Sequence, residues 1–246
     1  KRIGSPKKIA VAVSGGADSM ALLYALYQIR DKFGFDLLCI HVNHGLRNEA
    51  VYEEEKVLDF CKTKNIDCVS ERVYVEKKGS VELNARVARY EAFEKIRKEK
   101  AFDILALAHH KVDQAETVLM RLFYGTGVKA LSGIRELNSY LWRPFLSLDK
   151  DELIQYLEEN EVDYSTDSSN FDTKYTRNAI RHRLIPEIEK IYPKAVDSIY
   201  RLSRILETES DYIERHVAEW MKDNSTCTEW LFETDLSKFS SLDLAI

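Results

Sequence analysis

The chain has 246 residues, of which 45% are hydrophobic and 31% charged, and its formal net charge is −5. This composition is ordinary for a soluble globular protein and carries no global nucleic-acid signature, although a local basic patch can still attract RNA. The apolar stretches are interrupted by polar residues and none approaches a membrane span, so we expect a cytoplasmic protein with no membrane partner.

Short β-type runs alternate with longer helical patterns over the first half of the chain. The runs predict strands at 9–14, 37–43, 68–75 and 103–108. Helices are expected at 18–30, 48–64, 80–100 and 113–123. This order predicts a doubly wound α/β fold with a mainly parallel sheet. Ligands of such sheets bind at the carboxyl ends of the strands.

After residue 140 the pattern becomes mostly helical. A helix is expected from Ser147 or Asp149 to Asn160, followed by a polar loop over 163–175. Further helices are expected over 177–188 and from Pro193 to about Met221. The parallel sheet is therefore predicted to be followed by a helical segment and the start of a C-terminal domain.

The segment Ser14-Gly15-Gly16-Ala17-Asp18-Ser19 lies between a predicted strand and a predicted helix. Glycines let the backbone turn tightly towards an anion, and the helix start adds unpaired N–H donors. Asp18 beside a phosphate requires a bridging cation such as Mg²⁺. The segment predicts a metal–nucleotide site, although an ordinary capped turn is an alternative. The commonest nucleotide loop is absent, because no glycine is followed by lysine.

This loop resembles the SGGxDS signature of the PP-loop ATP pyrophosphatases, which cleave ATP between the α and β phosphates and adenylate a substrate. The resemblance implies an adenine nucleotide alpha hydrolase-like fold. Within that superfamily, several segments resemble the tRNA(Ile)-lysidine synthases. The continuous segments are residues 41–47, 108–117, 143–146, 167–170 and 175–182. The single residues are Leu119, Arg121 and Leu122 after the second segment, and Glu82, Ala85, Arg86, Arg89 and Tyr90 before it.

The resemblance implies a ligase that forms a C–N bond. ATP with Mg²⁺ would adenylate the C2 carbonyl oxygen of the wobble cytidine in the anticodon loop of an isoleucine tRNA, with release of pyrophosphate. Free L-lysine would then attack C2, giving lysidine and AMP. The implied domains are a PP-loop ATP-binding catalytic domain at 1–190, a helical connector at 191–222 and the beginning of an incomplete C-terminal domain at 223–246. The sequence leaves a homodimer open.

The site residues follow from the resemblance and the spacing together. The expected catalytic residues are Asp18, Asp113, Glu116 and Arg177. ATP is expected at Ser14, Gly15, Gly16, Ala17, Asp18, Ser19 and His41, with Mg²⁺ at Asp18 and Asp113. RNA contacts are assigned to Arg86, Arg89 and Arg181. Structural alternatives stay open: Asp113 as a plain helix N-cap, and the arginines as solvated helix faces or surface ion pairs.

The histidines and cysteines raise the question of a transition-metal site. His41, His44, His109 and His110 fall near two predicted strand ends, where they either bind zinc or line a polar cleft. We expect the cleft, because no cysteine accompanies them. The four cysteines form no C-x-x-C pair and are expected to be reduced thiols.

Two other functions stay open. One is another PP-loop tRNA-modifying enzyme such as a thiolase, although thiolases commonly use paired cysteines. The other is a nucleotide-binding sensor without chemistry, which would bind ATP but show no tRNA-dependent release of pyrophosphate.

Overall fold

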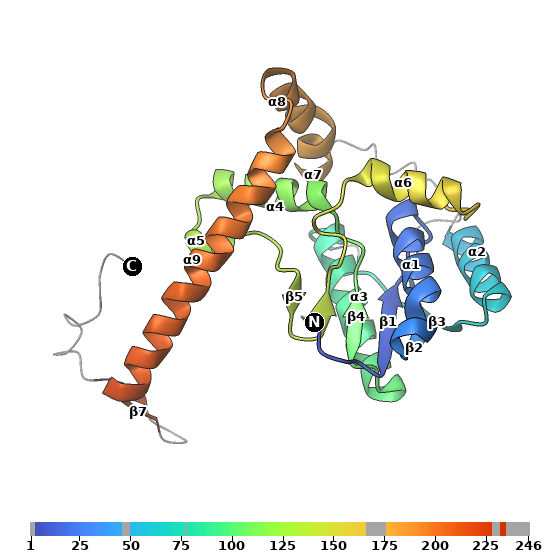
Figure 1. The fold of residues 1–246 in the computed structure, drawn as a ribbon, viewed down its shortest axis with the longest axis horizontal. Helices are drawn as coiled ribbons and strands as arrows, with labels where there is room; N and C mark the ends of the chain where they lie inside the picture. The colour runs from blue at the N-terminus through green and yellow to red at the C-terminus, as the bar shows by residue number, and fades with distance from the viewer. Residues whose placement is uncertain (1–2, 46–49, 77, 166–175, 228–231, 235–246) are drawn as a thin grey trace.

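A computed structural model describes residues 3–45, 50–76, 78–165, 176–227 and 232–234 (Figure 1). Its centre is a six-stranded sheet in the order β3-β2-β1-β4-β6-β5. The strands are β1 (Lys8–Ala12), β2 (Asp36–Asn43), β3 (Asp67–Arg72), β4 (Ile104–Ala106), β5 (Leu137–Asn138) and β6 (Leu141–Trp142). All neighbours pair in parallel except β5 and β6. The mainly parallel sheet predicted from the sequence is confirmed.

Helices cover both faces of this sheet, so its central strands are apolar on both sides. The helices are α1 (Ala17–Phe33), α2 (Ala50–Thr63), α3 (Val81–Lys100) and α6 (Lys150–Glu159). On β1, Ile9 and Val11 pack with α1, α2 and α6, whereas Ala10 between them packs with α3. Alternate side chains of a strand point to opposite faces, and this places the core on both sides of β1.

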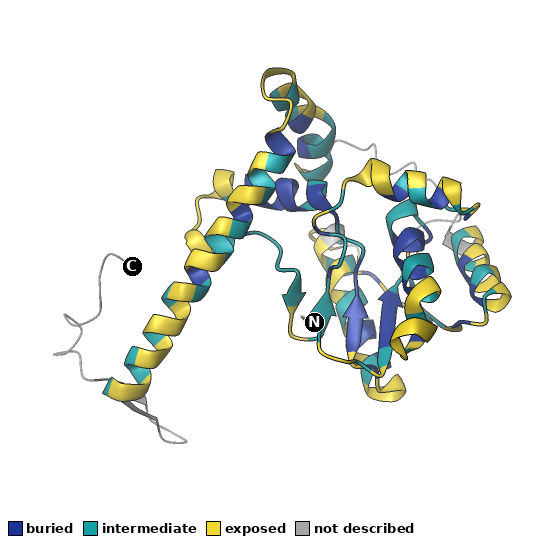
Figure 2. Ribbon diagram, viewed as in Figure 1, coloured by how far each residue is buried: buried dark blue, intermediate teal, exposed yellow. Residues whose placement is uncertain are grey.

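A helical layer lies beside the sheet and carries a third, smaller core. It consists of α4 (Lys111–Tyr124), α5 (Val128–Leu131), α7 (Thr176–Ala179), the π-helix Ile180–Leu184, α8 (Ile185–Ile191) and α9 (Ala195–Asn224). Ala115 and Leu119 of α4 pack there against Ile180, Ile185 and Val196. Helix α9 then runs away from the sheet, and Figure 2 shows its far part mostly exposed.

The sequence predicted the segment 177–188 as one helix, and that prediction is wrong in detail. The segment is divided into α7, a π-helical turn and α8. Pro186 stands in the first turn of α8. Proline has no N–H to donate to the preceding turn and its ring crowds that turn, so the wider π-helix accommodates it.

The C-terminal part of the described chain adds a small hairpin. Strand β7 (Ser225–Cys227) pairs antiparallel with β8 (Phe232–Thr234). The expected motif at 167–170 lies outside the described residues, as does most of the predicted loop. The division at residues 190 and 222 stays a prediction.

Within the described ranges, no helix is both long and apolar enough to cross a membrane.

Gln114 is buried and ties α4 to the turn that follows α5 and to α9. Its amide donates to Ser132 O at 3.0 Å and Ser203 Oγ at 2.8 Å, and its oxygen accepts from Ile134 N at 2.6 Å. Gly133 lies against it with φ +80°, and a Cβ there would come within 2.6 Å of the amide nitrogen. The turn therefore has room only for glycine.

We expect Gly133→Ala to lower the free energy of unfolding by about 3 kcal/mol, through left-handed backbone strain and overpacking against Gln114. Urea unfolding measures this loss. Gly127→Ala is the matched control, because Gly127 has φ −75° and its Cβ would meet nothing within 4 Å. It should cost less than about 1 kcal/mol. Equal losses in the two variants would contradict the packing described for Gly133.

Candidate active site

The loop between β1 and α1 is shaped to leave backbone N–H groups free for an anion. Gly15 has φ +94°, a left-handed conformation that favours glycine, and Gly16 is the N-cap of α1. Because glycine has no side chain, the first N–H groups of α1 are not capped by their own N-cap residue. Ser19 Oγ donates to Gly16 O at 2.9 Å and accepts from Ser14 N at 3.1 Å. The loop is thus preorganised around an open helix start.

Neighbouring segments hold this loop in place. Ser165 N donates to Gly15 O at 2.8 Å. His41 is 3% exposed, and its Nδ1 lies 2.9 Å from Val13 O, so Nδ1 carries the hydrogen and donates to that carbonyl. The His41 ring therefore fixes the end of β1, where the loop begins. Its expected contact with adenine stays a prediction.

Glu54 of α2 organises the carboxyl ends of β2 and β3. It accepts from Asn43 Nδ2 at 2.8 Å and from Ser70 Oγ at 2.5 Å. These two hydrogen bonds lower the pKa of the Glu54 carboxyl below its usual value. Sequence reasoning missed this residue, because nothing in the acidic helix start distinguishes it from Glu53 or Glu55.

Asp18 of α1 and Asp113 of α4 meet at His110. His110 Nδ1 accepts from Val112 N at 3.2 Å, so its Nε2 carries the hydrogen. That Nε2 lies 3.8 Å from Asp18 Oδ2 and 3.6 Å from Asp113 Oδ2. The two carboxylates were expected at one sheet edge, and the fold brings them to the two sides of one imidazole.

His110, rather than Asp113, is the N-cap of α4. Asp113 occupies the third helical position and accepts from His110 N at 2.9 Å, which completes a capping box. The alternative of Asp113 as a plain N-cap is therefore wrong. The capping bond uses one of its two oxygens.

Asp18 fits a Mg²⁺ ligand better than Asp113 does. Asp18 Oδ1 is buried and accepts no hydrogen bond from the described part of the chain. Asp113 Oδ1 instead lies 2.6 Å from Arg181 Nη2, so both of its oxygens already have partners. Mg²⁺ is commonly held by one or two carboxylates together with phosphates and water, and the bare oxygen of Asp18 suits that arrangement.

Glu116 lies one turn along α4 between two arginines and is 0% exposed. Arg177 Nε lies 3.1 Å from its Oε2, and Arg181 Nε contacts its Oε1. Burial raises the pKa of Glu116 to about 7, although the charge of Arg181 opposes this. Arg181, predicted to contact RNA, is here paired with Glu116 and Asp113, and its RNA contact stays a prediction.

The raised pKa of Glu116 predicts a pH-dependent stability difference between the wild type and Glu116→Gln. Between the ordinary pKa of 4.5 and about 7, the folded protein holds a proton that the unfolded chain has released. The stability from the neutral carboxyl is complete below pH 4.5 and is lost as the pH rises through 7. We expect the difference to change by up to about 3 kcal/mol across this window in urea unfolding. A pH-independent difference would contradict the raised pKa.

Arginines also surround His109 beside the carboxylates. Burial lowers the pKa of His109 to about 4, and the charges of Arg143, Arg177 and Arg89 act in the same direction. His109 is therefore neutral at pH 7, within a basic cluster suited to phosphate groups. Arg143 is 6% exposed, and it was not assigned a role from the sequence although its segment carried the family resemblance.

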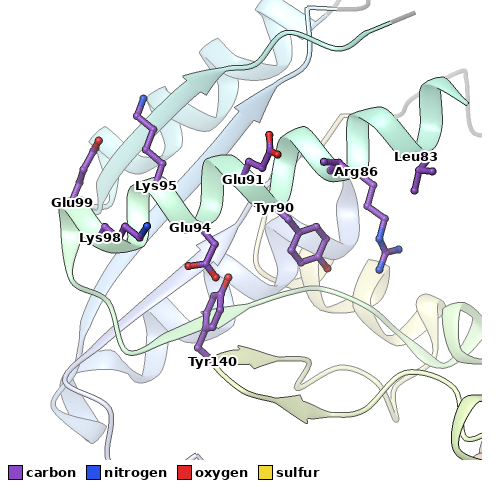
Figure 3. A pocket seen from close by; sticks show the side chains of 10 residues that line it. Leu83, Arg86, Tyr90, Glu91, Glu94, Lys95, Lys98, Glu99 and Tyr140 are labelled. Atoms are coloured by element: carbon purple, nitrogen blue, oxygen red, sulfur yellow. The ribbon is translucent and has the colours of Figure 1, made fainter. Parts of the chain in front are cut away.

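Arg86 lines an open groove along α3, next to this cluster. Figure 3 shows its side chain beside Tyr90, with Glu94 and Tyr140 further along the same groove. Its guanidinium carbon lies 5.5 Å from the centre of the Tyr90 ring. Arg86 is exposed and Arg89 half-buried, but both lie near the Tyr90 ring, since the guanidinium carbon of Arg89 is 6.0 Å from its centre. Their RNA contacts stay a prediction.

The histidine zinc site is not formed. Among the described residues, the groups of three or more His, Cys, Asp or Glu close enough to share a metal ion consist of one set, Cys39 with Cys61 and Cys68. His41 instead holds the end of β1, and His110 caps α4.

A strand, a glycine loop and an uncapped helix start, with an acidic residue in the first turn, define a PP-loop nucleotide-binding protein. The model of the PP-loop domain family matches residues 3–188, and the chain belongs to that family, which implies ATP binding. Several of its curated relatives are tRNA(Ile)-lysidine synthases. That of Clostridium tetani is 33% identical over 98% of this chain and 53% of its own length. That of Thermosipho africanus is 38% identical over 79% of this chain and 47% of its own length.

This chain spans about half the length of these curated relatives. A solved structure, the U34-tRNA thiolase NcsA from Methanococcus maripaludis with its [4Fe-4S] cluster, superimposes with a TM-score of 0.68. It is 22% identical, covering 83% of this chain and 74% of the thiolase chain. At that identity the likeness establishes the fold alone.

Proposed function

We propose that this chain ligates lysine to C2 of the wobble cytidine of an isoleucine tRNA, forming lysidine with release of AMP and pyrophosphate. The named function of its curated relatives supports this reaction. The observation that carries it is the meeting of Asp18, at an anion-binding helix start, with the carboxylate–arginine cluster of α4. The helix start suits the phosphates of a nucleotide. The carboxylates of the cluster suit an amine, and its arginines suit a polyanion.

The loop would receive the pyrophosphate half of ATP. The N–H groups that follow Gly15 stabilise negative charge as it develops on the leaving group. Mg²⁺ held by Asp18 would neutralise part of that charge. Arg143 and Arg177 would orient phosphate oxygens or the RNA backbone.

The lysine amine requires an acidic partner near the reacting base. Asp113 has 15% of its side chain exposed, whereas Glu116 is enclosed by Arg177 and Arg181. We infer that the negative charge of Asp113 attracts the lysine ammonium group, and that Glu116 positions the two arginines. His110 lies between the two carboxylates, with its Nε2 3.8 Å from Asp18 Oδ2 and 3.6 Å from Asp113 Oδ2.

Nucleotide products test the proposal. The purified full-length protein, given ATP, Mg²⁺, L-lysine and unmodified isoleucine tRNA, should release AMP and pyrophosphate in equal amounts, and only when tRNA is present. ADP and phosphate as products would overturn it. Binding of ATP without turnover would instead support the sensor alternative. A homodimer stays a prediction, which analytical ultracentrifugation tests by measuring the mass of the protein in solution.

The thiolase alternative has less support. The described cysteines Cys39, Cys61 and Cys68 belong to or pack against the core under the sheet. A cysteine that transfers sulfur must reach the activated base. Release of AMP that depends on a sulfur donor, and not on lysine, would favour the thiolase.

A further inference from the structure

Three of the four cysteines of the chain converge at one point in the fold. The sulfur atoms of Cys39, Cys61 and Cys68 all lie within 4.8 Å of one another. They come from β2, α2 and β3, so sequence spacing gave no sign of the group. Cys39 and Cys68 are directly paired in the parallel register, and Cys61 packs over them from α2.

The geometry points to a site for a single ion. Cys39 and Cys61 are buried, and Cys68 is half-buried. A zinc–sulfur bond of about 2.3 Å places the sulfurs of one ion about 3.8–4.0 Å apart, so the present separations need only a small contraction. Thiolates are soft ligands that select Cu(I) and Zn(II) over Mg²⁺.

We propose that Cys39, Cys61 and Cys68 bind one thiophilic d¹⁰ cation, Cu(I) or Zn(II), through three sulfurs. The thiol protons leave to solvent as the ion binds, since the thiolate is the ligand. Cu(I) accepts three-coordinate sulfur directly, and Zn(II) would add a water molecule from the side of Cys68.

An iron–sulfur cluster does not suit these residues. A four-iron cube holds its cysteine sulfurs farther apart than the sulfurs lie here. The cysteines are also set back from the carboxyl edge of the sheet, since Cys39 precedes the end of β2 at Asn43 by four residues. The site is therefore separate from the nucleotide loop.

An ion bound to the three cysteines would link β2, β3 and α2, which also form one side of the candidate active site. Strand β2 carries Asn43, β3 carries Ser70 and α2 carries Glu54, and these residues form the hydrogen-bonded network described above. Figure 1 shows the three elements side by side at one end of the sheet. An ion bound to all three would stiffen that end of the sheet.

Metal titration of the reduced full-length protein without oxygen tests the proposal. Zn(II) and Cu(I) are added in separate arms, each against a chromophoric chelator of known affinity. We expect one ion per chain, three sulfur neighbours in X-ray absorption and a higher melting temperature with the ion that binds. For zinc, the sulfurs should lie at about 2.3 Å. Failure of both ions to compete with their chelators would overturn the proposal.

Single variants assign the ligands. Cys39→Ala, Cys61→Ala and Cys68→Ala should each weaken binding at least tenfold, whereas Cys227→Ala should bind as the wild type does. Circular dichroism without metal checks that each variant folds, and Cys68→Ser at the half-buried position provides a second, milder change. Binding that survives loss of Cys68 unchanged would contradict the three-sulfur site.

Discussion

Asp18→Asn is expected to reduce turnover about a thousandfold, because it removes the charge that would hold Mg²⁺ at the nucleotide loop. The amide keeps the size of the side chain, and Asp18 makes no hydrogen bond through Oδ1 within the described residues. The free energy of unfolding should therefore change by less than about 1 kcal/mol. Steady-state AMP release and urea unfolding measure the two effects.

Asp31→Asn is the matched control on the same helix. Its carboxylate is 95% exposed and lies 3.7 Å from Arg30 Nε, away from the loop. Turnover of this variant should stay within about twofold of the wild type, as expected for a surface charge. An Asp18→Asn protein with more than a tenth of the wild-type rate would remove Asp18 from the metal site.

Glu116→Ala is expected to lower the free energy of unfolding by about 3–5 kcal/mol, because it leaves the charges of two partly buried arginines without their carboxylate. Arg177 would lose its ion pair, and Arg181 would keep only the pair with Asp113. Turnover of Glu116→Ala should also fall, because Arg177 and Arg181 would no longer be held in position by the carboxylate. Glu116→Gln preserves the shape and should cost about 1–2 kcal/mol.

Glu158→Ala provides the control for this second prediction. Glu158 is exposed on α6, and its removal should change the free energy of unfolding by less than about 0.5 kcal/mol. Urea unfolding at pH 8, above the pKa of about 7 for Glu116, compares the variants with that carboxyl ionised in the wild type. Equal losses for Glu116→Ala and Glu158→Ala would show that the buried cluster adds nothing to stability.

The main strands and helices of the first half could be predicted because their apolar residues recur with clear periods. The β5–β6 pair could not, since each strand has two residues and no period can be read from it. The π-helical turn depends on Pro186 within a segment that otherwise reads as one helix. Local pattern thus gave the larger elements and missed those that only packing defines.

Part of the candidate site could likewise be predicted from the sequence, and part could not. Asp18 and Asp113 could be placed together, because both follow strands whose carboxyl ends share an edge. The pairing of Arg181 with Glu116 spans 65 residues and depends on how the π-helix packs on α4. The grouping of three cysteines also arises only when β2, α2 and β3 come together. Contacts that depend on how helices and strands pack, rather than on the shared edge of a sheet, carry no such signal in one sequence.

Lysine incorporation tests the central claim most directly. The full-length protein is incubated with ATP, Mg²⁺, isotopically labelled L-lysine and unmodified isoleucine tRNA, and the nucleosides of the digested RNA are analysed by mass spectrometry. We predict one labelled lysidine per tRNA, at the wobble position, with none when ATP is omitted. An unmodified wobble cytidine after incubation with folded, ATP-binding protein would contradict the proposed function.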